Sequence, residues 1–217
     1  MFVGHFAPAL VAAAQPRAAG LGTLFIAAQI LDIGFAALLI PGLEAMRIVP
    51  GITAMNPMDL YHMPYTHSLL GALLWSLLFG ALVGLASGRR AAAVGAGIVV
   101  LSHWFLDLAV HIPDLTLFGE PPRLGLGLWN HPYAEMPLEI LLTAGALLYY
   151  AVRTQAPPGD RRLWLLAGLL ALFQAVDWFG PKENVYSLAI PATMIIAYAL
   201  LALAAWWAGR ERAATAA

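Results

Sequence analysis

Residues 101–114, LSHWFLDLAVHIPD, place two histidines and two aspartates at the end of an otherwise apolar run. At about 100° per residue on a helix, these four side chains fall within roughly 80° of one another and form one polar stripe. The stripe consists of His103, Asp107, His111 and Asp114. Neutral imidazole and ionised carboxylate are the ligands that Zn²⁺ and similar ions take, so the stripe is a candidate metal site. Helix–helix hydrogen bonding is the alternative interpretation.

The composition indicates what kind of protein must position this stripe. The 217 residues are 61% hydrophobic and 11% charged, whereas soluble domains are about 25% charged. Apolar runs long enough to cross a bilayer recur along the whole length, which predicts an integral membrane protein. The net charge of −1 gives no sign of nucleic-acid binding. The chain has no cysteine, so disulfides and thiolate metal ligands are excluded.

The apolar runs predict an all-α, polytopic helical bundle in one membrane-embedded domain, residues 1–217, with about six transmembrane helices after a short N-terminal helix. The first run, residues 2–15, is too short to span alone. The expected spans are 20–40, 67–87, 91–112, 135–153, 163–180 and 187–209. We expect irregular loops at 41–65 and 113–134, Thr66 as the cap of the helix that follows it, and a solvated tail at 210–217.

The basic residues predict the orientation of the bundle. Eight of the 11 Lys and Arg residues fall on one side of it. These eight are Arg17, Arg89, Arg90, Arg153, Arg161, Arg162, Arg210 and Arg212. The positive-inside rule makes that side cytoplasmic. We therefore expect an integral protein of a bacterial inner (plasma) membrane, N-out and C-in, with both long loops outside.

Helical rise predicts that the intramembrane polar residues share one depth. His5 and Asp32 both lie about 20 Å from the turn near Ala18, and His103 lies about 20 Å above the turn before it. Glu139 reaches about 25 Å from its own turn. Polar residues with separate structural roles have no reason to share a layer, so the coincidence favours a site in the outer half of the bilayer. A structural pair of His5 with Asp32 is the alternative.

Further polar residues lie close to this layer. Asp59, His62 and His67 fall in the segment DLYHMPYTH, which also suits a polar loop at the head-group level. Glu139 and Asp177 could equally pair with basic residues near the interface.

Four short motifs, in a fixed order, resemble a known family. They are Gly4-His5, Asp32 in the second apolar run, His62 followed by Thr66-His67-Ser68, and Ser102-His103 followed by Asp107. The set is similar to the YdjM-like, LexA-regulated membrane-bound metal-dependent hydrolase family, and it covers roughly the first half of the chain. The resemblance implies metal-site roles for His5, Asp32, His67, His103 and Asp107, with His62 close by. The family's P-D-I-D-H element is reduced here to L-D-I-G-F, with Gly34 and Phe35 in place of Asp and His.

The first hypothesis from these residues is a hydrolase that uses a divalent metal, with Zn²⁺ as the first candidate. His62, His111 or Glu139 would move the proton, and a lipid or other phosphoester is the expected substrate. The second hypothesis is a non-catalytic accessory subunit of a larger membrane complex. The third is a tetrapyrrole-binding protein, since buried histidine can ligate such a cofactor.

Overall fold

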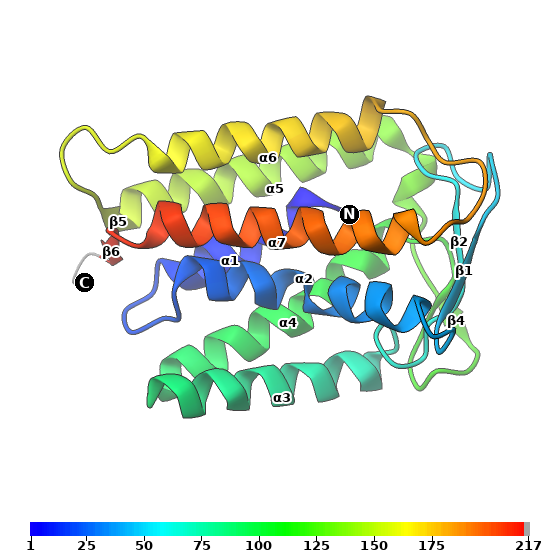
Figure 1. The fold of residues 1–217 in the computed structure, drawn as a ribbon, viewed down its shortest axis with the longest axis horizontal. Helices are drawn as coiled ribbons and strands as arrows, with labels where there is room; N and C mark the ends of the chain where they lie inside the picture. The colour runs from blue at the N-terminus through cyan, green and yellow to red at the C-terminus, as the bar shows by residue number, and fades with distance from the viewer. Residues whose placement is uncertain (215–217) are drawn as a thin grey trace.

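The computed structural model describes residues 1–214, and within this range six helices are long and apolar enough to span a membrane. They are α2 (Leu21–Leu39), α3 (Leu69–Ser87), α4 (Arg90–Val110), α5 (Pro132–Arg153), α6 (Arg162–Phe179) and α7 (Ala189–Gly209). Before them, a 3-10 turn η1 (Val3–His5) leads into the short helix α1 (Phe6–Ala13). The prediction of an all-α membrane bundle is therefore confirmed. The helices run side by side, and the N-terminus lies partway along the length of the bundle (Figure 1).

Helix α2 is the centre of the bundle and contacts α1, α4 and α7. It is the most buried of the six long helices. The Phe6 ring of α1 stacks on Phe25 at a centroid distance of 4.3 Å. Gly22 lets α7 approach closely, because a Cβ at this position would lie 2.5 Å from the Cβ of Trp206. The helix that carries Asp32 is thus held on several sides.

Helices α3 and α4 form a tight pair. The Ser68 hydroxyl oxygen accepts a hydrogen bond from the backbone N–H three residues on and caps α3. The prediction that Thr66 is the cap was wrong, because Thr66 lies in the preceding turn. Gly88 ends α3 with a φ of 66°, which allows the short turn into α4. The Ser76 hydroxyl donates to the Gly97 carbonyl at 2.7 Å and ties the two helices together.

The two long connections contain short antiparallel hairpins, so the expectation of irregular loops was wrong in part. The hairpins pair β1 (Ala45–Ile48) with β2 (Met58–His62), and β3 (Leu115–Thr116) with β4 (Arg123–Leu124). Arg47 and Asp59 form an ion pair at 2.6 Å across the first of them. The hairpins lie together at one end of the bundle (Figure 1).

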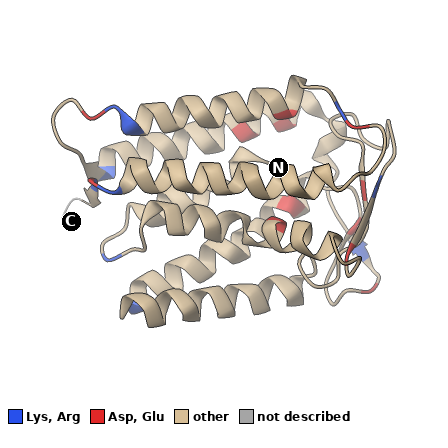
Figure 2. Cartoon of the chain, viewed as in Figure 1, with Lys and Arg blue, Asp and Glu red and all other residues tan. Residues whose placement is uncertain are grey.

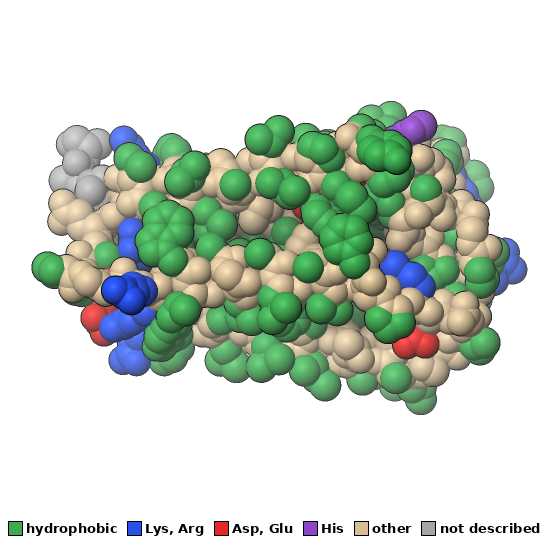
Figure 3. All heavy atoms as spheres, turned by 90° about the horizontal axis from the view of Figure 1, so that it is seen from above, with side chains coloured by type: hydrophobic (Ala, Val, Ile, Leu, Met, Phe, Trp, Pro, Cys, Tyr) green, Lys and Arg blue, Asp and Glu red, His purple; other side chains and the backbone are tan. Residues whose placement is uncertain are grey.

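The opposite end carries most of the basic residues (Figure 2). There β5 (Thr154–Gln155) pairs with β6 (Ala213–Ala214), and Arg212 Nε donates to Thr154 Oγ1 at 3.0 Å. The expected solvated tail was wrong in part: Arg210, Glu211 and Ala213 are exposed, but residues 213–214 pair with β5, and residues 215–217 lie outside the described range. Figure 3 shows hydrophobic side chains along the length of the visible face and Lys and Arg toward its two ends. This distribution suits a protein that crosses a membrane.

Candidate metal centre

The five side chains expected to hold a metal meet at one place in the structure. His5 comes from η1, Asp32 from α2, His67 from the turn before α3, and His103 and Asp107 from α4. Two groups, His5–His103–Asp107 and Asp32–His67–His103, each bring three potential ligand atoms within 4.8 Å of one another. His103 belongs to both groups, so together they form a single centre.

Asp107 lies in the middle of this centre. Its Oδ1 is 3.0 Å from His5 Nε2 and 3.5 Å from His111 Nε2. Its Oδ2 is 3.0 Å from His103 Nε2 and 3.6 Å from His67 Nε2. Each carboxylate oxygen thus faces a different pair of histidines.

Asp32 approaches the same histidines from the other side. Its Oδ1 lies 3.3 Å from His67 Nε2 and 3.5 Å from His103 Nε2, and its Oδ2 accepts a hydrogen bond from the Tyr198 hydroxyl at 2.8 Å. The imidazole of His5 contacts Asp107 instead. A simple structural pair of His5 with Asp32 is therefore not the arrangement found.

The outward nitrogens of His103 and His111 have partners that fix the ring orientation, whereas Nδ1 of His5 is buried without a partner in residues 1–214. His103 Nδ1 lies 2.7 Å from the Ala28 carbonyl oxygen. A carbonyl can only accept, so this nitrogen carries a hydrogen and Nε2 points its lone pair or second proton toward the carboxylates. His111 Nδ1 likewise lies 2.8 Å from Asp114 Oδ1. Outer partners of this kind are typical of histidines that bind metals.

His67 is oriented by a short chain of hydrogen bonds that the sequence pattern did not predict. Thr66 Oγ1 donates to Glu44 Oε2 at 2.7 Å, and Oγ1 lies 2.8 Å from His67 Nδ1. Because the hydroxyl proton is used on Glu44, the hydroxyl oxygen accepts from the His67 ring. Glu44 is buried and also accepts from the backbone N–H groups of Tyr65 and Thr66. In the sequence, the only sign of a role for Glu44 is that it is an isolated carboxylate just after a long apolar run.

We expect Thr66→Val to lower the affinity for a divalent metal by about 10–100-fold, because the His67 ring loses the partner that fixes its orientation. Competition with a metal-sensitive dye on the purified protein measures this change. Thr66→Ser keeps the hydroxyl and serves as the matched control, with affinity close to that of the original protein. An unchanged affinity in Thr66→Val would mean that the hydrogen-bond chain only stabilises the fold.

The donor set fits a divalent cation. Imidazole nitrogens and carboxylate oxygens together suit Zn²⁺, Mn²⁺ and Fe²⁺. His103 Nε2 is buried 3.0 Å from Asp107 Oδ2, but within residues 1–214 no contact of this nitrogen has the geometry of a hydrogen bond. The buried carboxylate of Asp107 and the half-buried carboxylate of Asp32 face four imidazoles and need protons or a cation between them, since unpaired charge in a low-dielectric interior is costly.

The three residues that were expected to move a proton lie in different surroundings in the structure. His111 lies at the centre, and His62 lies exposed at the end of β2 and does not line the cavity described below. Burial disfavours the charged imidazole of His111, but the carboxylates of Asp107 and Asp114 outweigh it and raise its pKa to about 9. Glu139 is buried, and its Oε1 accepts from the backbone N–H groups of Phe2 and Gly4 at 2.5 and 2.9 Å. It thereby holds the turn that carries His5.

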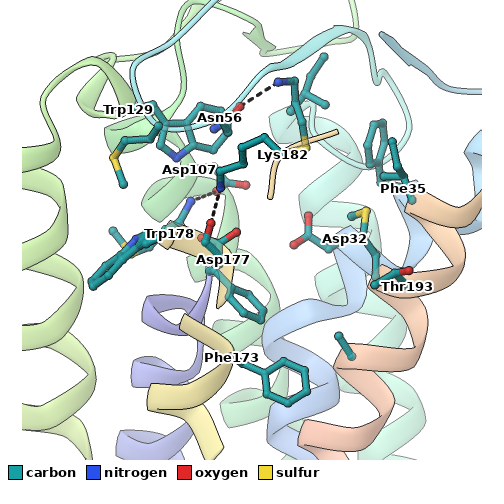
Figure 4. A pocket seen from close by; sticks show the side chains of 18 of the residues that line it. Asp32, Phe35, Asn56, Asp107, Trp129, Phe173, Asp177, Trp178, Lys182 and Thr193 are labelled. Atoms are coloured by element: carbon teal, nitrogen blue, oxygen red, sulfur yellow. Dashed lines mark hydrogen bonds and ion pairs between the residues drawn. The ribbon is translucent and has the colours of Figure 1, made fainter. Parts of the chain in front are cut away.

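A cavity of about 410 Å³ leads from this centre toward α6 and α7. Asp32 and Asp107 of the centre line it, as do Asp177 and Lys182 (Figure 4). Its apolar part is formed by side chains from the facing ends of the two helices. These side chains are Phe173, Val176, Ile190, Met194 and Ala197. Val176 is 61% exposed, so the cavity reaches the side of the bundle.

No protein-family model, curated protein or solved structure matches the chain.

Proposed function

We propose that the protein is a membrane-bound metal-dependent hydrolase, with Zn²⁺ as the first candidate for its divalent cation. The ligands would be His5, Asp32, His67, His103 and Asp107. The proposal rests on the meeting of these five side chains from separate segments, with ring nitrogens 3.0–3.6 Å from shared carboxylate oxygens. The order of the sequence motifs, which resembles the YdjM-like hydrolase family, agrees with it.

The surrounding residues suit hydrolysis. A divalent cation held there would make a coordinated water more acidic and polarise a phosphoryl or acyl oxygen. His111 lines the cavity with Nε2 3.5 Å from Asp107, so it is placed to transfer a proton near the reacting atoms. The two backbone N–H groups on Glu139 Oε1 give that carboxylate a positioning role. The exposed ring of His62 has no part in this scheme.

The cavity favours a substrate taken from the bilayer. Its apolar part lies between the outer ends of α6 and α7, and Figure 3 shows a hollow on the face of the bundle that carries α6. A lipid could place its chains there and its ester group at the metal centre. A lipid or lipid-linked phosphoester is therefore the substrate class that we propose.

We place the basic end of the bundle in the cytoplasm of a bacterial cell and the hairpins outside, in the inner membrane. Because the chain has no cysteine, single cysteines report the orientation directly. Ala54→Cys and Glu120→Cys, both at exposed positions in the hairpin loops, should react with an impermeant thiol reagent on intact spheroplasts. Pro158→Cys, exposed in the loop before α6, should react only after lysis. The opposite pattern would reverse the orientation.

The decisive experiment is metal analysis and an absorption spectrum of the gently purified protein, followed by hydrolysis assays on lipid phosphoesters with and without a chelator. Bound zinc or manganese, together with chelator-sensitive release of product, supports the hydrolase. Protein free of both metal and chromophore supports the accessory-subunit hypothesis instead. A visible chromophore supports tetrapyrrole binding, which the crowding of carboxylates around the imidazole nitrogens disfavours.

A further inference from the structure

Four carboxylates outside the metal centre line the same cavity, and three of them lie on α5 and α6. Glu135 and Glu139 lie one helical turn apart on α5, and Asp177 lies on α6. We refer to Glu135, Glu139 and Asp177 as the acidic wall. Glu135 interacts electrostatically with both of the other members, so the three form one group.

Glu135 is the member of the acidic wall with a buried oxygen that lacks a partner in the described residues. Glu139 accepts from two backbone N–H groups, and Asp177 Oδ2 accepts from Gln174 at 3.4 Å. Glu135 is only 1% exposed, and its Oε2 has no hydrogen-bond partner within the described part of the chain. A buried carboxylate oxygen that borders a cavity without a partner suggests that a ligand supplies one.

Positive charge near the acidic wall is scarce. Lys182 donates through Nζ to the backbone carbonyl of Asp177, and the Met1 amino nitrogen lies 3.7 Å from Asp107 Oδ1. The same amino group also interacts with Glu135 and Asp177, so one lysine and one amino group shared with Asp107 face the three carboxylates of the acidic wall. Buried charges of one sign are costly inside a membrane protein, so a cation from outside the chain would be bound favourably.

The spacing of the acidic wall favours an organic cation over a metal ion. The wall is not among the groups of described residues that bring three ligand atoms within 4.8 Å of one another. Trp129 and Trp178 border the same cavity (Figure 4). The indole Nε1 of Trp178 is buried and lacks a partner in residues 1–214. Aromatic faces beside carboxylates attract ammonium groups.

We propose that the acidic wall binds the ammonium group of a zwitterionic phosphoester, with Glu135 as its main partner. This inference rests on the proposed function only in that the metal centre would hold the phosphate of the same molecule. The substrate class is thereby narrowed to phosphoesters that carry an amine, such as an aminoalkyl phospholipid head group.

The test is isothermal titration of the purified full-length protein with phosphoethanolamine and with glycerol phosphate, which share the phosphate but differ in the ammonium group. We expect phosphoethanolamine to bind at least tenfold more tightly. In Glu135→Gln the preference should fall below about threefold while the metal content stays unchanged. Glu120→Gln, which removes an exposed carboxylate from an outer loop, should behave like the original protein.

Several results would overturn the proposal. They are equal affinities for the two probes, no binding of either, a preference that persists in Glu135→Gln, or a loss of metal in that variant. The Asp107→Asn variant distinguishes failure of the ammonium-binding proposal from failure of the proposed metal-dependent function. Without the metal both probes should bind more weakly, but the preference for the ammonium group should remain.

Discussion

Asp107→Asn should leave the protein inserted in the membrane but without the proposed metal and the proposed hydrolase activity. The side chain keeps its shape, yet it loses the charge that faces His5 and His111 through one oxygen and His67 and His103 through the other. We expect the metal affinity to fall by more than the roughly 100-fold that loss of an outer partner can cause. The metal content and the yield of detergent-solubilised protein, measured on the same membrane preparation, check the result.

The matched control is Asp114→Asn, which lies seven residues after Asp107 in the connection that follows α4. Asp114 contacts only the outward nitrogen of His111 among the histidines of the centre, so this variant should retain most of its metal. His103→Ala should behave like Asp107→Asn, because His103 belongs to both groups of candidate ligands. Full metal occupancy in both Asp107→Asn and His103→Ala would show that the stripe is structural.

Glu139→Leu should lower the free energy of unfolding by about 2–4 kcal/mol, since two buried backbone N–H groups lose their charged acceptor. The turn that carries His5 is released by the same change, so we also expect weaker metal binding. Thermal unfolding in detergent, followed by circular dichroism with and without added zinc, measures both effects.

Glu139→Gln provides the comparison, because its amide oxygen can still accept from Phe2 and Gly4. It should lose less than half as much stability as Glu139→Leu. If the two variants are equally stable and both retain metal, the anchoring role assigned to Glu139 is wrong.

The sequence predicted the helices because their signals are local. Apolar runs and turn residues set the ends of the six long helices to within a few residues, and the spacing of His103 and Asp107 placed both on one face of α4. The shared depth of His5 and Asp32 also followed from helical rise alone. Which histidine contacts which carboxylate did not follow, because rotation about each helix axis depends on packing between segments far apart in the chain.

The partners around the centre were harder to predict for the same reason. Glu44 reaches Thr66 only because the chain folds back after α2, and no periodic pattern marks such a contact. His62 was expected near the centre by its position in a motif, but pairing of β2 with β1 holds it at the exposed end of the hairpin. Short strands of this kind give little signal in a Pro-rich loop.

The attachment of η1 also has a consequence for biosynthesis. Val3 donates its backbone N–H to Gln174 on α6 at 3.1 Å, and Gly4 donates to Glu139 on α5. Residues early in this sequence are thus fixed by helices that are synthesised after them. His5 can take its final place only after most of the chain has been inserted. A nascent chain arrested before α6 should therefore contain three of the five proposed metal ligands in folded helices and His67 in the turn before α3, while His5 still samples other positions.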